Sequence, residues 1–122
     1  MKKRIQSFVY ACRGIKVVFL SETNMQIHIV IALLVLIFGF MFKISIAEWI
    51  VCLLCIGLVF GAEMMNTAIE NVVDLASPDL HPLAGKAKDI AAGAVLLCAI
   101  TSVVVGLLIF GPKVWNILLP IL

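Results

Sequence analysis

Apolar residues gather in three long stretches of the chain, and short polar segments separate them. A helix that crosses the hydrocarbon of a bilayer needs roughly 20 mostly apolar residues, and the stretches are of about that length. No stretch alternates apolar and polar residues as a membrane strand does, so only helices can satisfy the backbone in lipid. The pattern predicts an all-α membrane protein with three transmembrane helices, at about residues 27–42, 49–70 and 87–110.

The second apolar stretch continues beyond one bilayer crossing. Its helical pattern extends from Trp49 to about Ala76, where Ser77-Pro78 breaks it. The last turns of this helix must therefore project into the interface or beyond it. Turn-forming residues interrupt the chain at three further places, which are 43–47, 79–86 and Gly111-Pro112. We expect the last of these to end the third helix.

The N-terminal segment, residues 2–20, has the pattern of an amphipathic helix. Its apolar residues recur at helical spacing, and they are Ile5, Phe8, Val9, Cys12, Ile15 and Phe19. Its positive charges are Lys2, Lys3, Arg4, Arg13 and Lys16. We expect this helix to lie along the membrane surface. The alternative is a cytosolic helix that packs on protein.

The composition excludes a soluble domain. The 122 residues are 64% hydrophobic and only 13% charged, with a mean hydropathy of +1.22, whereas a small soluble chain needs more polar surface. We expect one domain, residues 1–122. Disulfides are not expected, because the cysteines lie mostly in apolar runs and Cys52-x-x-Cys55 has no second pair or histidine cluster with it.

The distribution of basic residues predicts the orientation in the membrane. Seven flank the first and third spans on one side, and they are Lys2, Lys3, Arg4, Arg13, Lys16, Lys86 and Lys88. Only Lys43 and Lys113 fall on the other side. Because cytoplasmic segments carry the excess of Lys and Arg, we expect the N-terminus and the second loop in the cytoplasm and the C-terminus outside.

The polar chemistry is concentrated on one face of the second helix. Glu63, Asn66, Glu70 and Asp74 follow the spacing 0, 3, 7, 11, which places them in a stripe about 80° wide. Glu63 lies inside the apolar stretch, about two turns deeper than Glu70. An ionisable residue in a membrane helix is costly and normally faces protein or water, where it usually has a function.

Topology brings further groups to the same membrane depth. Glu22 precedes the first span, and Lys88 and Asp89 open the third. Carboxylate and amide oxygens suit magnesium, which binds through one or two carboxylates plus substrate phosphates, and lysine can neutralise phosphate oxygens. The chain has none of the glycine-rich nucleotide-binding loops that are usual in soluble enzymes. The alternative is a solvated helix end, with Glu63 paired to Lys88 as a packing device.

Two motifs at these residues resemble the small prokaryotic diacylglycerol kinase family, which includes the undecaprenol kinases. The first is Glu63-Met-Met-Asn66-Thr67-Ala68-Ile69-Glu70-Asn-Val-Val-Asp74, and the second is Gly85-Lys86-Ala87-Lys88-Asp89-Ile-Ala-Ala-Gly93-Ala-Val. Glu22-x-Asn24 and Glu48-Trp49 also fit, and the resemblance covers nearly the whole chain. It implies a homotrimer in the bacterial inner membrane, with active sites between subunits, that transfers the ATP γ-phosphate to a lipid hydroxyl with Mg²⁺.

The resemblance also implies roles for individual residues. Glu63 resembles the general base that contacts the lipid substrate, and Glu22 and Glu70 resemble the metal-binding carboxylates. The nucleotide site would include Gly14, Asn66, Glu70, Lys88 and Asp89.

The surface helix departs from the best-known member near Gly14. Ala11 and Cys12 stand where that member has a hydroxyl residue and an aromatic one. We therefore expect only the backbone at Gly14 to approach the nucleotide.

The resemblance is stronger to the undecaprenol kinase branch than to the diacylglycerol branch, on three features. These are His28, Ser45-x-x-Glu48-Trp49 and His81-Pro82-Leu83-Ala84. Diacylglycerol remains the alternative substrate, and both histidines could be interfacial residues without a catalytic part. A proton-coupled transporter subunit and a purely structural membrane subunit are the rival classes. We expect no nucleic-acid partner.

Overall fold

The computed structural model describes all residues, 1–122, and consists of four helices without strands. They are α1 (Lys2–Ser21), α2 (Thr23–Met41), α3 (Ile46–Ala76) and α4 (Pro82–Leu118). Three of them, α2, α3 and α4, are long and apolar enough to cross a membrane. The prediction of an all-α protein with three candidate membrane spans is confirmed.

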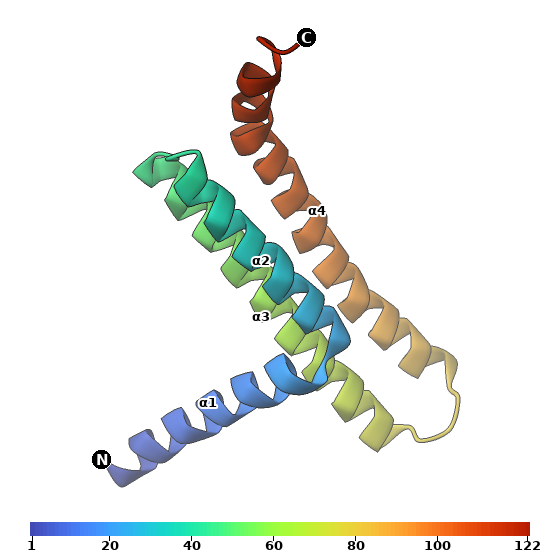
Figure 1. Ribbon diagram of the computed structural model, residues 1–122. Helices are drawn as coiled ribbons and strands as arrows, with labels where there is room; N and C mark the ends of the chain where they lie inside the picture. Colours follow the sequence, from blue (N-terminus) through green and yellow to red (C-terminus); the bar gives the residue numbers. More distant parts are fainter.

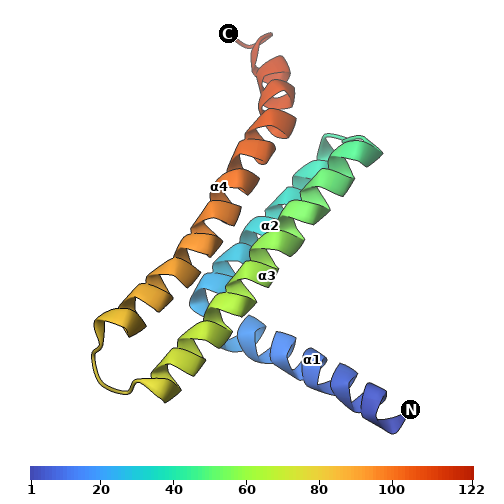
Figure 2. The ribbon, with the colours of Figure 1, turned by 180° about the vertical axis from the view of Figure 1, so that it is seen from behind.

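The three long helices run alongside one another, and α3 packs against both α2 and α4 (Figure 1). One end of this group carries the loop between α3 and α4, residues 77–81, and the start of α2; we call it the loop end. The other end carries residues 42–45 and the C-terminus; we call it the turn end. Helix α1 leaves the loop end at a steep angle to the other helices, as both views show (Figures 1 and 2).

A capping box determines where α3 begins. The Ser45 hydroxyl accepts a hydrogen bond from the Glu48 amide (3.1 Å), and the Ser45 amide donates to Glu48 Oε1 (3.0 Å). The two contacts satisfy amide groups that have no partner inside the helix. The helix therefore starts at Ile46, three residues before the predicted span, and it ends at Ala76 as the Ser77-Pro78 break predicts.

Both predicted ends of the last helix are wrong. The predicted loop 79–86 is shorter, because α4 starts at Pro82 with His81 as its N-cap: His81 Nδ1 accepts a hydrogen bond from the Leu83 amide (3.1 Å). Proline suits the first helical position, where its missing N–H costs nothing. At the other end the helix continues through Pro112 to Leu118, although proline removes one helical hydrogen bond.

The single chain buries few of its side chains. Only 11 of 122 residues are buried, and most large apolar side chains are exposed, as expected for a surface that faces lipid or other subunits. Helix α1 contacts the rest of the chain only near its C-terminal end. There Val18 is buried and the Phe19 ring packs edge-on against Phe60, with 5.4 Å between ring centroids.

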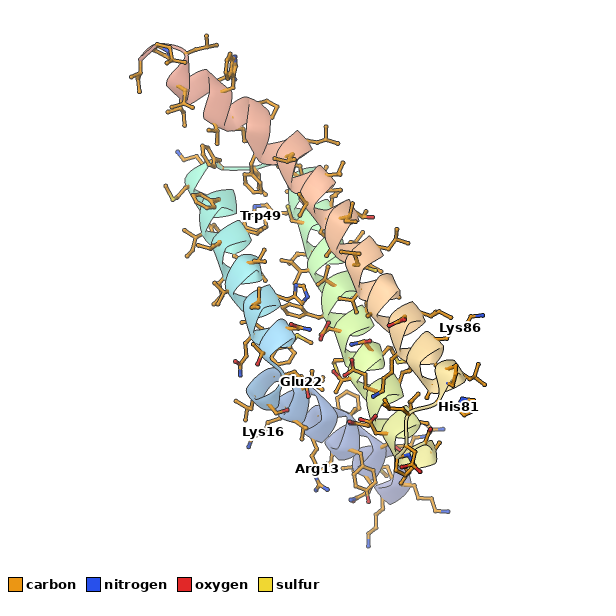
Figure 3. All side chains as sticks on the ribbon, turned by 90° about the vertical axis from the view of Figure 1, so that its right-hand side faces the viewer. Arg13, Lys16, Glu22, Trp49, His81 and Lys86 are labelled. Atoms are coloured by element: carbon orange, nitrogen blue, oxygen red, sulfur yellow. The ribbon has the colours of Figure 1, made fainter.

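A glycine brings α2 and α3 together at the turn end. Gly39 is buried, and a Cβ atom added to it would lie 2.5 Å from the Trp49 ring. The close approach requires glycine, because any side chain would collide with the indole. Figure 3 shows Trp49 at this end, far from Glu22 at the opposite end of the same helices.

Candidate active site

Glu63 is the most deeply placed charged residue of the chain. It projects from α3 and is 2% exposed, yet its carboxylate accepts no hydrogen bond from any other residue of the chain. Its nearest basic neighbour is His28 of α2, whose Nε2 lies 4.0 Å from Glu63 Oε2. The carboxylate oxygens keep a small accessible surface, and a carboxylate so deep in an apolar helix is costly without hydrogen bonds, so stability does not explain this residue.

One turn further along α3, two more buried polar side chains have free oxygens. Asn66 and Thr67 are each 6% exposed, and neither Asn66 Oδ1 nor Thr67 Oγ1 has a hydrogen-bond partner. Asn66 uses its amide nitrogen to donate to Glu70 Oε1, over 3.4 Å. Buried polar atoms are normally paired, and unpaired ones indicate a ligand or water that completes the site.

Charged side chains from α3, from α4 and from the junction of α1 and α2 continue the polar region toward the loop end. Lys88 of α4 forms an ion pair with Asp74 of α3, where both side chains are accessible. The charge of Glu70 also acts on Lys88, and the charges of Glu70 and Glu22 act on Glu63. Figure 3 shows Glu22 where α1 meets α2. The site is therefore a graded cluster, with Glu63 at the buried end and the ion pair at the accessible end.

The structure brings most of the predicted residues together. Glu22, Glu63, Asn66, Glu70 and Lys88 belong to one cluster at the loop end. The alternative in which Glu63 pairs with Lys88 is wrong, because Lys88 pairs with Asp74, about three helical turns further along α3.

Two predicted residues lie outside this cluster. Gly14 lies in the exposed part of α1, with nothing within 4 Å of the position that a Cβ would take, and Asp89 is exposed on α4. Figure 3 shows the side chains of Arg13 and Lys16 projecting from α1 on the side away from the long helices. Within one chain, these two side chains point away from the cluster.

The donor set suits a hard cation bound together with phosphate. No three His, Cys, Asp or Glu side chains of the chain are close enough to hold a metal ion by themselves. Magnesium does not require such a cage, because it binds through one or two carboxylates plus substrate phosphates and water. The Glu70 carboxylate and the unpaired Asn66 oxygen are oxygen ligands of the right kind. The residues present therefore fit the ion.

An apolar cavity of about 230 Å³ lies between α2, α3 and α4 and reaches the cluster at His28. Its walls are almost entirely apolar, from Ile31 and Val59 near the site to Phe110 toward the turn end. Neither this cavity nor the contact between His28 and Glu63 is predicted by the sequence pattern. The only available signal was that both residues fall at similar depths of neighbouring spans.

Fold and site together define a multi-span membrane protein with an unpaired buried carboxylate between an apolar cavity and a cluster of charges. The family model for prokaryotic diacylglycerol kinase matches residues 9–110. The undecaprenol kinase of Bacillus subtilis (strain 168) is 49% identical over 113 residues, which are 93% of this chain and 92% of that protein. The diacylglycerol kinase of Escherichia coli (strain K12) is 28% identical over 100 residues, 82% of each chain.

A third relative is the diacylglycerol kinase of Synechocystis sp. (strain ATCC 27184 / PCC 6803 / Kazusa). It is 41% identical over 101 residues, which are 82% of this chain and 58% of the relative. The chain belongs to the prokaryotic diacylglycerol kinase family, and it is an enzyme of the lipid kinase class.

Proposed function

We propose that this protein transfers the γ-phosphate of ATP to the hydroxyl of a membrane lipid with the help of Mg²⁺, and that the lipid is undecaprenol. The observation that supports this most strongly is Glu63. Its carboxylate is buried and free of hydrogen bonds, and it lies between an apolar cavity and a charged cluster. This is where a lipid hydroxyl and a phosphate can meet.

Glu63 acts as the general base in this proposal. Its free carboxylate oxygen accepts the proton of the lipid hydroxyl while the hydroxyl oxygen attacks the γ-phosphorus. The new O–P bond forms as the bond from the γ-phosphorus to the β–γ bridging oxygen breaks, and ADP leaves. Phosphoryl transfer depends on positioning and charge stabilisation more than on covalent chemistry, so a single base and a cationic cluster are sufficient.

Glu22 and Glu70 are the proposed metal ligands, with Asn66 beside them. Bound Mg²⁺ would neutralise charge on the ATP phosphates and hold them in position. Lys88 pairs with Asp74 and also feels the charge of Glu70, and it would bind phosphate oxygens once ATP competes with Asp74. Oxygen ligands, an amide and one lysine form a suitable set for this task.

The remaining nucleotide contacts, Gly14 and Asp89, are proposed to act across subunits. Both residues lie apart from the cluster of their own chain, on exposed surfaces of α1 and α4. A homotrimer with sites between subunits would bring α1 of one chain over the cluster of the next. The large exposed apolar area of the single chain is compatible with such an assembly.

The cavity supports undecaprenol over diacylglycerol. A polyprenol has a slender apolar chain behind its hydroxyl, whereas diacylglycerol adds two ester groups that need hydrogen-bond donors. The only hydroxyl in the cavity wall, Ser102, already donates to the Cys98 carbonyl (2.9 Å), so His28 is the main donor available. The 49% identity to an undecaprenol kinase supports the same choice.

The test compares the two lipids with purified protein in matched mixed micelles containing ATP and Mg²⁺. We expect ATP consumption that depends on Mg²⁺ and on added lipid alcohol. The specificity constant should be at least about tenfold higher for undecaprenol, equivalent to about 1.4 kcal/mol of differential transition-state binding. An equal or higher specificity constant for diacylglycerol would overturn the proposed substrate. The proposal that the protein is a lipid kinase would still hold.

We also propose that the loop end faces the cytoplasm of a bacterial cell, with the protein in the inner membrane and α1 along its surface. The excess of Lys and Arg at this end supports the orientation. In a background without the four native cysteines, single cysteines at Asp79 and Lys113 should react with an impermeant reagent from opposite sides. Labelling of both from outside would contradict this topology.

A further inference from the structure

His28 and Glu63 face each other across the interface of α2 and α3. The distance from His28 Nε2 to Glu63 Oε2 is 4.0 Å, and the two side chains are 18% and 3% exposed. Neither makes a hydrogen bond with any other residue of the chain. A donor and an acceptor that are both largely buried and otherwise unpaired stabilise each other, because each is costly alone in an apolar setting.

The start of α2 is held firmly, so this pairing is a consequence of the fold. Met25, one turn before His28, is fully buried (0% exposed). The neighbouring Gln26 donates through Nε2 to the Leu20 carbonyl of α1 (3.0 Å), which fixes the bend between the two helices. These two contacts fix the rotation of the first turns of α2 about its axis, and His28 faces α3.

His28 also lines the apolar cavity between α2, α3 and α4. Its imidazole therefore lies on the boundary between the apolar space and the Glu63 carboxylate. A lipid whose chain occupies the cavity would bring its hydroxyl past the imidazole to reach Glu63. His28 is the only basic residue in the cavity wall.

We propose that His28 is a positioning residue for the reaction: its imidazole orients the Glu63 carboxylate at the mouth of the cavity, toward the lipid hydroxyl. The proposal rests on the proposed function of Glu63 as the base. A distance of 4.0 Å is longer than a hydrogen bond, so the imidazole can attract the carboxylate while both carboxylate oxygens remain able to accept a hydrogen bond. One carboxylate oxygen stays free to accept the proton of the hydroxyl.

Two amide variants of His28 test this directly. Glutamine can place an N–H near the position of Nε2, whereas asparagine carries the same amide on a shorter side chain that cannot reach Glu63. We expect His28→Asn to lower kcat about 10- to 100-fold, the effect of misplacing a catalytic group by about 1 Å, and His28→Gln to recover most of that loss. The KM for ATP should change less than about twofold in both variants.

The matched control is the other histidine. His81→Gln should leave kcat within about twofold of the parent, because His81 caps α4 and does not contact Glu63. Size-exclusion chromatography and thermal unfolding would verify that the His28 variants keep the fold of the parent. His28→Leu is an additional, more drastic variant, and the conclusion does not depend on its folding.

The outcomes separate the positioning role from a packing role and from the base itself. Equal kcat in the Asn and Gln variants, whether high or low, would overturn the positioning role. In a Glu63→Gln background, His28→Asn should cost almost nothing further, because the two residues act as a unit, and an additive loss would also overturn it. Near-normal turnover of Glu63→Gln alone would instead refute the base on which the proposal rests.

Discussion

Two glutamates of helix α3, Glu48 and Glu63, have opposite surroundings. Glu48, at the turn end, has a side chain that is 28% exposed, and it accepts hydrogen bonds from the Ser45 amide (3.0 Å) and from Lys113 Nζ (2.9 Å). Glu63, at the loop end, has a side chain that is only 3% exposed and accepts none within the chain.

The difference indicates what each carboxylate contributes. Glu48 closes a capping box and connects the start of α3 to the part of α4 beyond Pro112, so its partners explain why it is there. Glu63 has only His28 at 4.0 Å and no hydrogen bond within the chain, so stability does not explain its position. Residues that lower the free energy of unfolding are often functional, because the groups that an enzyme needs for activity are commonly placed at a cost in stability.

Turnover should distinguish the two glutamates most clearly. Glu63→Gln should lower turnover by about two to four orders of magnitude, the range for loss of a general base, with unchanged or higher thermal stability since a buried charge is removed. Steady-state kinetics and thermal unfolding in detergent measure the two quantities. Glu48→Gln is the matched control and should keep turnover within about twofold.

An intermediate effect is expected for Glu70, which lies between the buried and the accessible ends of the cluster. Glu70→Gln should weaken Mg²⁺-dependent ATP binding by about tenfold or more, the usual cost of losing or disturbing a metal ligand. Titration calorimetry at several Mg²⁺ concentrations measures this. Asp79→Asn, in the exposed loop, should leave the binding unchanged. If ATP binding by Glu70→Gln depends on Mg²⁺ as in the parent protein, Glu70 is not a metal ligand.

The smallest effect is expected at the turn end and concerns stability alone. A double-mutant cycle of Glu48→Gln and Lys113→Met should give only a small favourable coupling energy, because the pair is partly exposed and screened by solvent. Ser45→Ala should cost about 1 kcal/mol through loss of the helix cap. Denaturant unfolding in detergent measures these values. A loss of turnover without a loss of stability would place Glu48 in the active site and abolish the contrast.

Much of this protein follows from local pattern alone. The lengths of the apolar stretches determine three spans, because a bilayer sets the length of a helix that crosses it. The break at Ser77-Pro78 correctly marks the end of α3, and the helical spacing from Glu63 to Asp74 predicts one polar face. The roles of the individual site residues stay predictions until the variants are measured.

The two incorrect helix ends show where local signals fail. Pro82 looked like a loop residue, but proline is equally favourable at the first position of a helix, and His81 provides the cap. Pro112 looked like a helix end, yet α4 continues past it, and Lys113 in this continuation is paired with Glu48 of α3. An ion pair between residues far apart in the chain cannot be predicted from the residues next to the proline.

The membrane class, the number of spans and the polar face of α3 can be read from the residues alone, because these depend on composition and on helical period. The pairs that form between helices cannot be read in this way: His28 with Glu63, Lys88 with Asp74, and Lys113 with Glu48. Contacts between helices depend on the rotation and register of the helices. Those are set by packing along the whole interface, such as Gly39 against Trp49, and not by the residues adjacent in the chain.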